Sequence, residues 1–181
     1  MPLAAAIKIP MGTLMPSFQL SDPDRKEYRS SRLAGPKGLL VIFVSDHCPY
    51  TDAAWPRLVR HANYAKDLKI KTVAINVHNP QGDGIKGMKK KIKELTVTFP
   101  YLFDKTQKVA QNFQAQCTPE IFLYDQDLKL AYHGRIDDNW EDEAKVAVPN
   151  LKNALDAVAA GKPAERRQIS SMGSSIGRQR A

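Results

Sequence analysis

One short stretch, residues 39–50 (LLVIFVSDHCPY), constrains the fold more than any other part of the chain. Its first half is continuously apolar, which is typical of a strand buried on both faces. Pro49 suits the first turn of a helix, so Cys48 falls where a strand hands over to a helix. Free backbone N–H groups and the helix dipole stabilise an anion at such a place, and a thiolate is an anion. The stretch therefore predicts a reactive thiol at a strand-to-helix junction.

The segments around this junction alternate between strand and helix patterns. Apolar runs predict strands at 16–20, 70–77, 99–103 and 119–124, and a hairpin partner at 128–133. Residues 28–33 are expected to form a returning strand and a short helical turn. Helical spacing and capping residues predict helices at 49–68, 85–95, 105–113 and 149–160. Pro56 lies inside the first helix and is expected to kink or restart it. The pattern predicts an α/β sandwich, with a central mixed β-sheet flanked by helices and an N-terminal β extension.

Residues 1–160 are predicted to form one domain, followed by a basic, polar C-terminal tail at 161–181. Residues 1–15 are expected to be an irregular lead-in, and the tail is expected to be mobile because it has little to bury. No stretch reaches the roughly 18 apolar residues of a membrane span, and the first residues lack the pattern of a secretory signal. We expect a cytoplasmic protein with no membrane partner, and we leave its oligomeric state open.

The chain carries a formal net charge of +8. Much of the excess lies in one lysine-rich segment and in the tail: Lys86, Lys89, Lys90, Lys91, Lys93, Arg166, Arg167, Arg178 and Arg180. The lysines alternate with Ile85, Met88 and Ile92, as on the solvated face of an amphipathic helix. No aromatic side chain lies among them to stack on bases. The pattern favours a solvated helix face, so no nucleic-acid partner is predicted.

Several motifs follow one another along the chain: Gly12…Pro16-x-Phe18-x-Leu20, then His47-Cys48-Pro49-Tyr50, then Thr118-Pro119-Glu120-Ile121-Phe122-Leu123-Tyr124-Asp125, and then Tyr132-His133-Gly134-Arg135-Ile136-Asp137-Asp138-Asn139. Over residues 10–160 this order resembles the thioredoxin-like redoxins that carry the alkyl hydroperoxide reductase/thiol-specific antioxidant domain. The resemblance implies a thioredoxin fold and a cis Thr118–Pro119 bond beside the active site. From the sequence alone, cis is a minority form for any X-Pro bond.

Two serines depart from the family pattern. Ser45 stands where the family has the first Cys of Cys-x-x-Cys, and the chain reads Gly-Ser-Ser-Ile at 173–176 where the family tail reads Gly-Cys-Ser-Ile. A serine neither ionises near neutral pH nor forms a disulfide, so the usual dithiol cycle is absent. Ser45-x-x-Cys48 also resembles the Thr-x-x-Cys of peroxiredoxins, in which Ser45 would hydrogen-bond the thiolate or a peroxide oxygen. Val41 and Pro119 replace the Pro and the Arg of that pattern, so full peroxiredoxin efficiency is not expected.

The predicted site centres on Cys48 as the nucleophile. His47, as an imidazolium, would lower the pKa of the thiol, unless its side chain points to solvent. Cys117 lies two residues before the proline of the Thr-Pro motif and is predicted to resolve a Cys48 sulfenic acid or disulfide, although it fits a core residue equally well. Substrate contacts are predicted from residues beside the thiol: Pro49, Thr118 and Pro119.

These residues predict a thiol-dependent oxidoreductase that performs thiol–disulfide exchange or slow peroxide reduction. Its partners would be a protein or small-molecule thiol, disulfide or peroxide, with an external thiol as the reductant. No cofactor is predicted. His133, Asp137 and Asp138 lack the Cys-x-x-x-Cys of copper-binding relatives of the fold, so no metal site is predicted. Tyr50 and Trp55 fit either the site or the core. The alternative is a redox-silent binding module that keeps the fold and the proline-loop groove.

Overall fold

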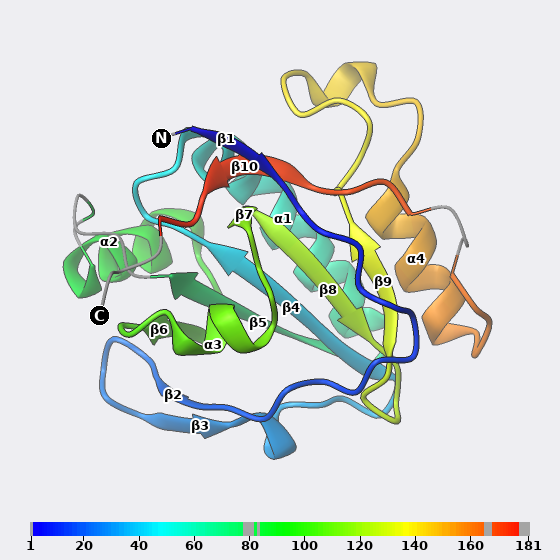
Figure 1. Ribbon diagram of the computed structural model, residues 1–181, viewed down its shortest axis with the longest axis horizontal. Coiled ribbons are helices and arrows are strands. Elements are labelled where there is room, and N and C mark those ends of the chain that lie inside the picture. Colours follow the sequence, from blue (N-terminus) through cyan, green and yellow to red (C-terminus); the bar gives the residue numbers. More distant parts are fainter. Residues whose placement is uncertain (1, 78–81, 83, 165–167, 178–181) are drawn as a thin grey trace.

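A mixed five-stranded sheet lies at the centre of the molecule, with the strand order β6-β5-β4-β8-β9 (Figure 1). The structure is a computed structural model that describes residues 2–77, 82, 84–164 and 168–177. The strands of this sheet are β4 (Gly38–Val44), β5 (Ile70–Val77), β6 (Tyr101–Asp104), β8 (Glu120–Tyr124) and β9 (Leu130–Gly134). Strand β4 pairs in parallel with β5 and antiparallel with β8. The predicted central mixed sheet is confirmed.

The two faces of the sheet carry separate cores. Leu40, Ile42 and Val44 pack against α1 (Pro49–Asp67), α2 (Ile85–Leu95) and α4 (Asn150–Ala159). Leu39, Val41 and Phe43 pack toward α3 (Lys108–Asn112) and the hairpin of β2 (Gln19–Ser21) and β3 (Glu27–Arg29). Short 3-10 turns lie at Ser30–Arg32 and Glu143–Lys145. Because successive side chains of a strand point to opposite faces, the continuous apolar run of β4 supplies both cores.

The helices of the structure follow the predicted pattern with two local differences. Helix α1 runs through Pro56 without restarting. Helix α3 begins at Lys108, later than the predicted start at residue 105. The carboxylate of Asp104 reaches across the intervening turn and accepts a hydrogen bond from the N–H of Ala110 at 2.8 Å. Asp104 therefore lies ahead of the N-cap residue Gln107, yet its carboxylate accepts an N–H group of the first helical turn.

Both described chain ends form strands, which corrects the prediction for them. Leu3–Ala5 form β1 and Met172–Ser175 form β10, which lies between β1 and β7 (Cys117–Thr118) in a second sheet (Figure 1). The predictions of an irregular lead-in and a mobile tail are therefore wrong for these residues. The tail has few apolar side chains, but strand pairing supplies partners for its backbone instead. The tail arginines Arg166, Arg167, Arg178 and Arg180 lie outside the described residues.

The lysine-rich segment forms α2, as predicted. Met88 is the residue that this helix buries completely, while Lys91 pairs with Asp52 and Lys89 with Asp24, each at 2.7 Å. The lysines thus lie on the solvated side and balance nearby carboxylates. Among the helices of the described ranges, none is both long and apolar enough to cross a membrane.

Candidate functional site

Cys48 is the N-cap residue of α1, so it lies at the strand-to-helix junction that the sequence indicates. Its sulfur accepts a hydrogen bond from the N–H of Thr51 at 3.3 Å. The same sulfur lies 3.1 Å from the hydroxyl of Ser174 and 3.0 Å from the carbonyl oxygen of Thr118. The side chain has no exposed surface. Three segments distant in sequence, α1, β7 and β10, therefore enclose this thiol.

Hydrogen bonds at this sulfur favour its ionised form. Burial raises the pKa of Cys48, but the side chains of Ser174 and Thr118 and the N–H and side chain of Thr51 together lower it by more, so the pKa lies below its ordinary value. The Thr51 N–H and a serine hydroxyl both donate to a thiolate, whereas the Thr118 carbonyl only accepts and so partners the protonated thiol. The site thus has a partner for each form of Cys48, and more partners for the anion.

Ser45 and His47 flank the thiol in sequence but have other partners. Ser45 is buried, and its hydroxyl accepts the backbone N–H of His47 at 3.5 Å. The His47 side chain is exposed. Ser174 is the serine whose hydroxyl contacts Cys48, and sequence reasoning missed it because it lies in the segment expected to be mobile. Its signal was the Gly-Ser-Ser-Ile run at 173–176, which stands where the family tail has a cysteine. The predicted roles of Ser45 and His47 stay predictions.

Cys117, in β7, is also buried, but its surroundings are acidic. Its sulfur lies 3.6 Å from Glu120 Oε2 and 3.8 Å from the carbonyl oxygen of Ser171. Burial and the Glu120 carboxylate raise the pKa of Cys117 far above its ordinary value. Cys48 and Cys117 are both free thiols, each with its own set of partners.

Glu120 organises the turn that carries Cys117, and sequence reasoning gave it no role. Its Oε2 accepts the N–H groups of Gln116 at 2.7 Å and Cys117 at 3.0 Å, and its Oε1 lies 2.8 Å from His133 Nε2. Within this turn the Thr118–Pro119 bond is cis. The available signal was a carboxylate placed inside an apolar strand, since a fully buried Glu requires several partners.

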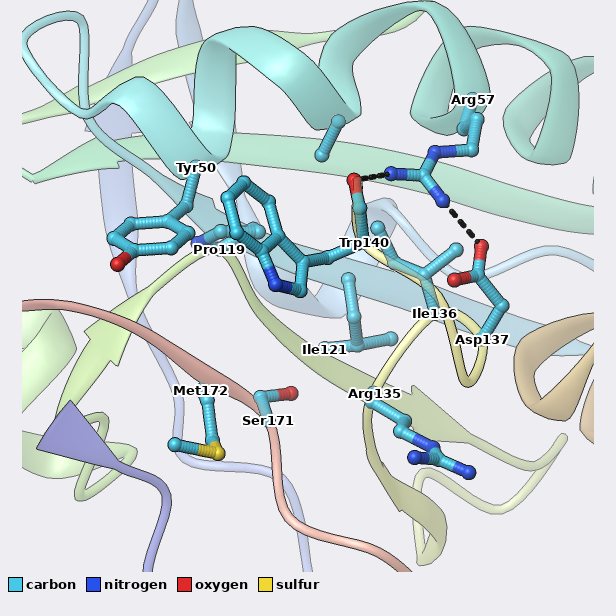
Figure 2. Close-up of a pocket in the computed structure, with 11 residues that line it drawn as sticks. Tyr50, Arg57, Pro119, Ile121, Arg135, Ile136, Asp137, Trp140, Ser171 and Met172 are labelled. Atoms are coloured by element: carbon cyan, nitrogen blue, oxygen red, sulfur yellow. Dashed lines mark hydrogen bonds and ion pairs between the residues drawn. The ribbon is translucent and has the colours of Figure 1, made fainter. Parts of the chain in front are cut away.

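A pocket opens beside Pro119 (Figure 2). Tyr50 and Trp140 lie on one side with ring centroids 5.0 Å apart, and Met172, which immediately precedes Gly173 in β10, lies across from them. Ile121 lies at its base, and the Arg135 guanidinium borders it. The pocket thus adjoins the proline turn whose Thr118 carbonyl contacts Cys48. Trp55, in contrast, belongs to the core, where it is 1% exposed.

Arg57 holds the loop that presents Trp140. Its Nη1 lies 2.8 Å from Asp137 Oδ2, and its Nη2 donates to the carbonyl of Trp140 at 2.6 Å (Figure 2). Nη1 also donates to the carbonyl of Asn139 at 2.7 Å. The ion-paired side chains are almost fully buried. A buried guanidinium with several acceptors fixes loop geometry, because moving the loop would leave a charge unpaired.

The residues considered for a metal site have other partners: His133 pairs with Glu120, and Asp137 with Arg57. Across the described part of the chain, no group of three or more His, Cys, Asp or Glu side chains is placed to hold a metal ion.

A mixed sheet between helices, a thiol at the start of a long helix and a cis-proline turn beside that thiol define a thioredoxin-like protein. The AhpC/TSA family model matches residues 11–133, and the chain belongs to the AhpC/TSA family. The family match, together with the fold, supports a thioredoxin-like redox function.

Two solved structures are similar over nearly the whole chain. An uncharacterized conserved protein from Geobacillus kaustophilus is 32% identical, with a TM-score of 0.93 over 100% of this chain and 98% of that one. A hypothetical protein from Sinorhizobium meliloti is 30% identical, with a TM-score of 0.90 over 98% and 99%. A peroxidoxin from Mycobacterium tuberculosis shares the fold at 16% identity, with a TM-score of 0.59 over 83% and 94%. Comparison with curated protein sequences finds no match.

Proposed function

We propose that this protein is a thiol-dependent oxidoreductase in which Cys48 is the nucleophile. The observation that carries the proposal is the position of the Cys48 sulfur, with the Thr51 N–H at 3.3 Å and the Ser174 hydroxyl at 3.1 Å. A thiolate is the reactive form of cysteine, and donors at the start of a helix stabilise it. The lowered pKa of Cys48 follows from the same contacts. Cys48 is therefore the better nucleophile of the two thiols.

The first step is thiol–disulfide exchange. The Cys48 thiolate attacks one sulfur of a substrate disulfide, a bond forms between the two sulfurs, and the other substrate sulfur leaves as a thiolate. The leaving thiolate takes a proton from water. The Thr118 carbonyl oxygen lies beside the reacting sulfur, Pro119 lines the adjoining pocket, and the exposed Pro49 begins α1.

An external thiol completes the cycle in this proposal. Its thiolate attacks the mixed disulfide, takes the substrate sulfur and releases Cys48 as a thiolate. Cys117 is the poorer resolving group, because burial and Glu120 keep its proton in place. With a peroxide, Cys48 would take one oxygen to become a sulfenic acid while the alcohol leaves, and two external thiols would return it to the thiol as a disulfide and water form. Val41 and Pro119 stand in place of the peroxiredoxin Pro and Arg, so this branch is the slower one.

The second candidate is the redox-silent binding module, which the complete burial of Cys48 favours. One experiment separates the two functions. Single-cysteine chains, Cys117→Ser and Cys48→Ser, are reacted at neutral pH with a small aromatic disulfide that releases a coloured thiolate. We expect Cys117→Ser to react as wild type does, and Cys48→Ser to stay at background. Titration of thiolate absorbance should place the pKa of Cys48 below the ordinary value of about 8.5. Background rates in both variants, with a pKa at or above that value, would favour the binding module.

A further inference from the structure

Strand β10 occupies the edge of β7 directly before the cis-proline turn. It pairs antiparallel with β7 so that Ser174 lies opposite Thr118 and Ser175 opposite Cys117. Its outer edge pairs with β1 (Figure 1). Pairing through the backbone recognises an extended chain whatever its side chains are. A second extended chain can take this place beside Cys48 only when β10 leaves it.

Steric fit at this edge selects glycine at one position. A Cβ at Gly173 would lie 2.1 Å from the carbonyl oxygen of Thr118 and 3.2 Å from the nitrogen of Pro119. The first distance is far inside van der Waals contact with rigid backbone, so no larger residue fits in this register. The residue that follows, Ser174, places its hydroxyl 3.1 Å from the Cys48 sulfur. In this register, the side chain of the residue that follows the glycine contacts the Cys48 sulfur.

The residue before the glycine meets the pocket beside Pro119. Met172 lines this pocket across from Tyr50 and Trp140 (Figure 2). Its side chain is 59% exposed, and that of Trp140 is 55% exposed. These two side chains leave apolar surface uncovered on both sides of the pocket. An apolar side chain larger than methionine at the Met172 position would cover more of that surface.

Strand β10 itself is held mainly through its backbone. Its four residues are one exposed methionine, one glycine and two serines, so it buries no large apolar side chain. Segments with few buried apolar contacts open at low free-energy cost compared with core strands. The segment that covers Cys48 is therefore among those that open most readily.

We propose that β10 is an internal occupant of the substrate strand position, and that the substrate is an extended polypeptide with the sequence apolar–Gly–Cys, its cysteine held in a disulfide. The substrate pairs with β7 in place of β10, its glycine against the Thr118 carbonyl and its sulfur at the position of the Ser174 hydroxyl. Cys48 attacks that sulfur, the substrate disulfide breaks, and the leaving sulfur departs as a thiolate. This inference rests on the proposed function of Cys48.

A pair of peptides tests the specificity. One copies residues 169–177 with S174C, and the other also carries Gly173→Val; in both, the cysteine is joined to an aromatic thiol whose release is coloured. With the full-length Cys117→Ser chain, we expect the glycine peptide to react about ten-fold faster, because the valine Cβ would overlap the backbone carbonyl oxygen of Thr118. Equal rates for the two peptides would overturn the inference.

A matched pair of chain variants tests the displacement of β10. Gly173→Ala in the Cys117→Ser chain should loosen β10 and speed alkylation of Cys48 by a bulky maleimide about ten-fold or more, on the same steric grounds. Gly177→Ala is the control, since a Cβ at Gly177 meets open space. Far-UV circular dichroism checks that the fold persists. Equal alkylation rates for Gly173→Ala and Gly177→Ala would count against β10 as the cover.

The small aromatic disulfide keeps the two proposals apart. If Cys48 reacts with it but does not discriminate between the peptides, the substrate inference fails and the proposed function stands. If Cys48 fails to react with it even in Gly173→Ala, the proposed function fails and this inference fails with it.

Discussion

Cys48 and Cys117 are both fully buried, yet their surroundings act in opposite directions. The Cys48 sulfur faces an N–H group, a hydroxyl and a carbonyl oxygen, whereas the Cys117 sulfur faces a carboxylate oxygen and a carbonyl oxygen. Desolvation raises the pKa of both thiols, so it does not separate them. Hydrogen-bond donors distinguish the two thiols, because donors stabilise a thiolate and acceptors repel one. The polarity of the neighbours, not burial, therefore distinguishes a nucleophile from an inert thiol.

The largest expected effect follows from removal of the Glu120 carboxylate, the acceptor beside Cys117. Glu120→Ala should destabilise the protein by about 3–5 kcal/mol, because it leaves His133 and the N–H groups of Gln116 and Cys117 without their buried partner. Chemical denaturation measures the loss. Glu120→Gln is the control, since one amide oxygen can still accept from the turn.

Glu120→Gln also tests whether the carboxylate charge raises the pKa of Cys117. In the Cys48→Ser chain, removing the carboxylate charge should lower the pKa of Cys117, which thiolate absorbance reports. A cost below about 1 kcal/mol for Glu120→Ala would show that Glu120 does not support the turn. An unchanged pKa of Cys117 in Glu120→Gln would show that the carboxylate does not hold the proton on that thiol.

The next prediction replaces the hydroxyl donor of Ser174 with a sulfur that can form a disulfide with Cys48. Ser174→Cys places a second sulfur where a hydroxyl lies 3.1 Å from the Cys48 sulfur, so mild oxidation should join the two. Closing so long a loop should stabilise the chain by about 2–4 kcal/mol, seen as a difference between oxidised and reduced denaturation curves. Ser170→Cys, earlier in the same segment, is the control. A mass spectrum with no disulfide between Cys48 and the introduced cysteine would show that β10 does not hold this register in solution.

A smaller effect follows when a donor is removed. In the Cys117→Ser chain, Ser174→Ala should raise the pKa of Cys48, because the thiolate loses a hydroxyl donor. Alkylation by iodoacetamide near neutral pH should slow by several-fold, with the pH profile shifted upward. Ser175→Ala is the matched control in the same strand. An unchanged pH profile for Ser174→Ala would mean that the Ser174 hydroxyl does not stabilise the thiolate.

A further effect is a difference in how stability depends on pH. The lowered pKa of Cys48 stabilises the fold above the unfolded pKa of about 8.5, and this is lost as the pH falls through the folded pKa. The raised pKa of Cys117 stabilises the fold below that value, and this is lost as the pH rises. From pH 8 to pH 10, Cys48→Ser should therefore lose more stability than Cys117→Ser, by up to about 1.4 kcal/mol per pH unit. Denaturation midpoints that change equally with pH in the two variants would show that the two thiols do not differ in this way.

The local pattern of the chain predicted most of the central sheet and its helices. The apolar run of β4 and the alternating lysines of α2 act through residues a few positions apart, and α2 has the predicted bounds. The N-cap position of Cys48 was predictable for the same reason, since Pro49 and the end of the apolar run lie next to it. The start of α3 was not, because the Asp104 contact depends on how the turn folds back.

The strands at the two ends were missed because their stability is not local. Met172–Ser175 has no buried large side chain of its own, so composition alone indicates a loose tail. Its order comes from pairing with β1 and β7, segments that lie far away in the sequence. Backbone pairing leaves little trace in side-chain patterns, apart from the glycine that fits against Thr118.

The thiol at the start of α1 follows from local residues, because a buried strand followed by proline dictates that junction. Its contacts with distant segments came from the tertiary structure. The fold placed Ser174 against Cys48 across 126 positions of the chain, and Glu120 against Cys117 through a cis-proline turn. A hydrogen bond acts over about 3 Å, so the chemistry of each sulfur depends on which segments meet in space. Pairing of β10 with β7 is what gives Cys48 its hydroxyl donor and also its cover.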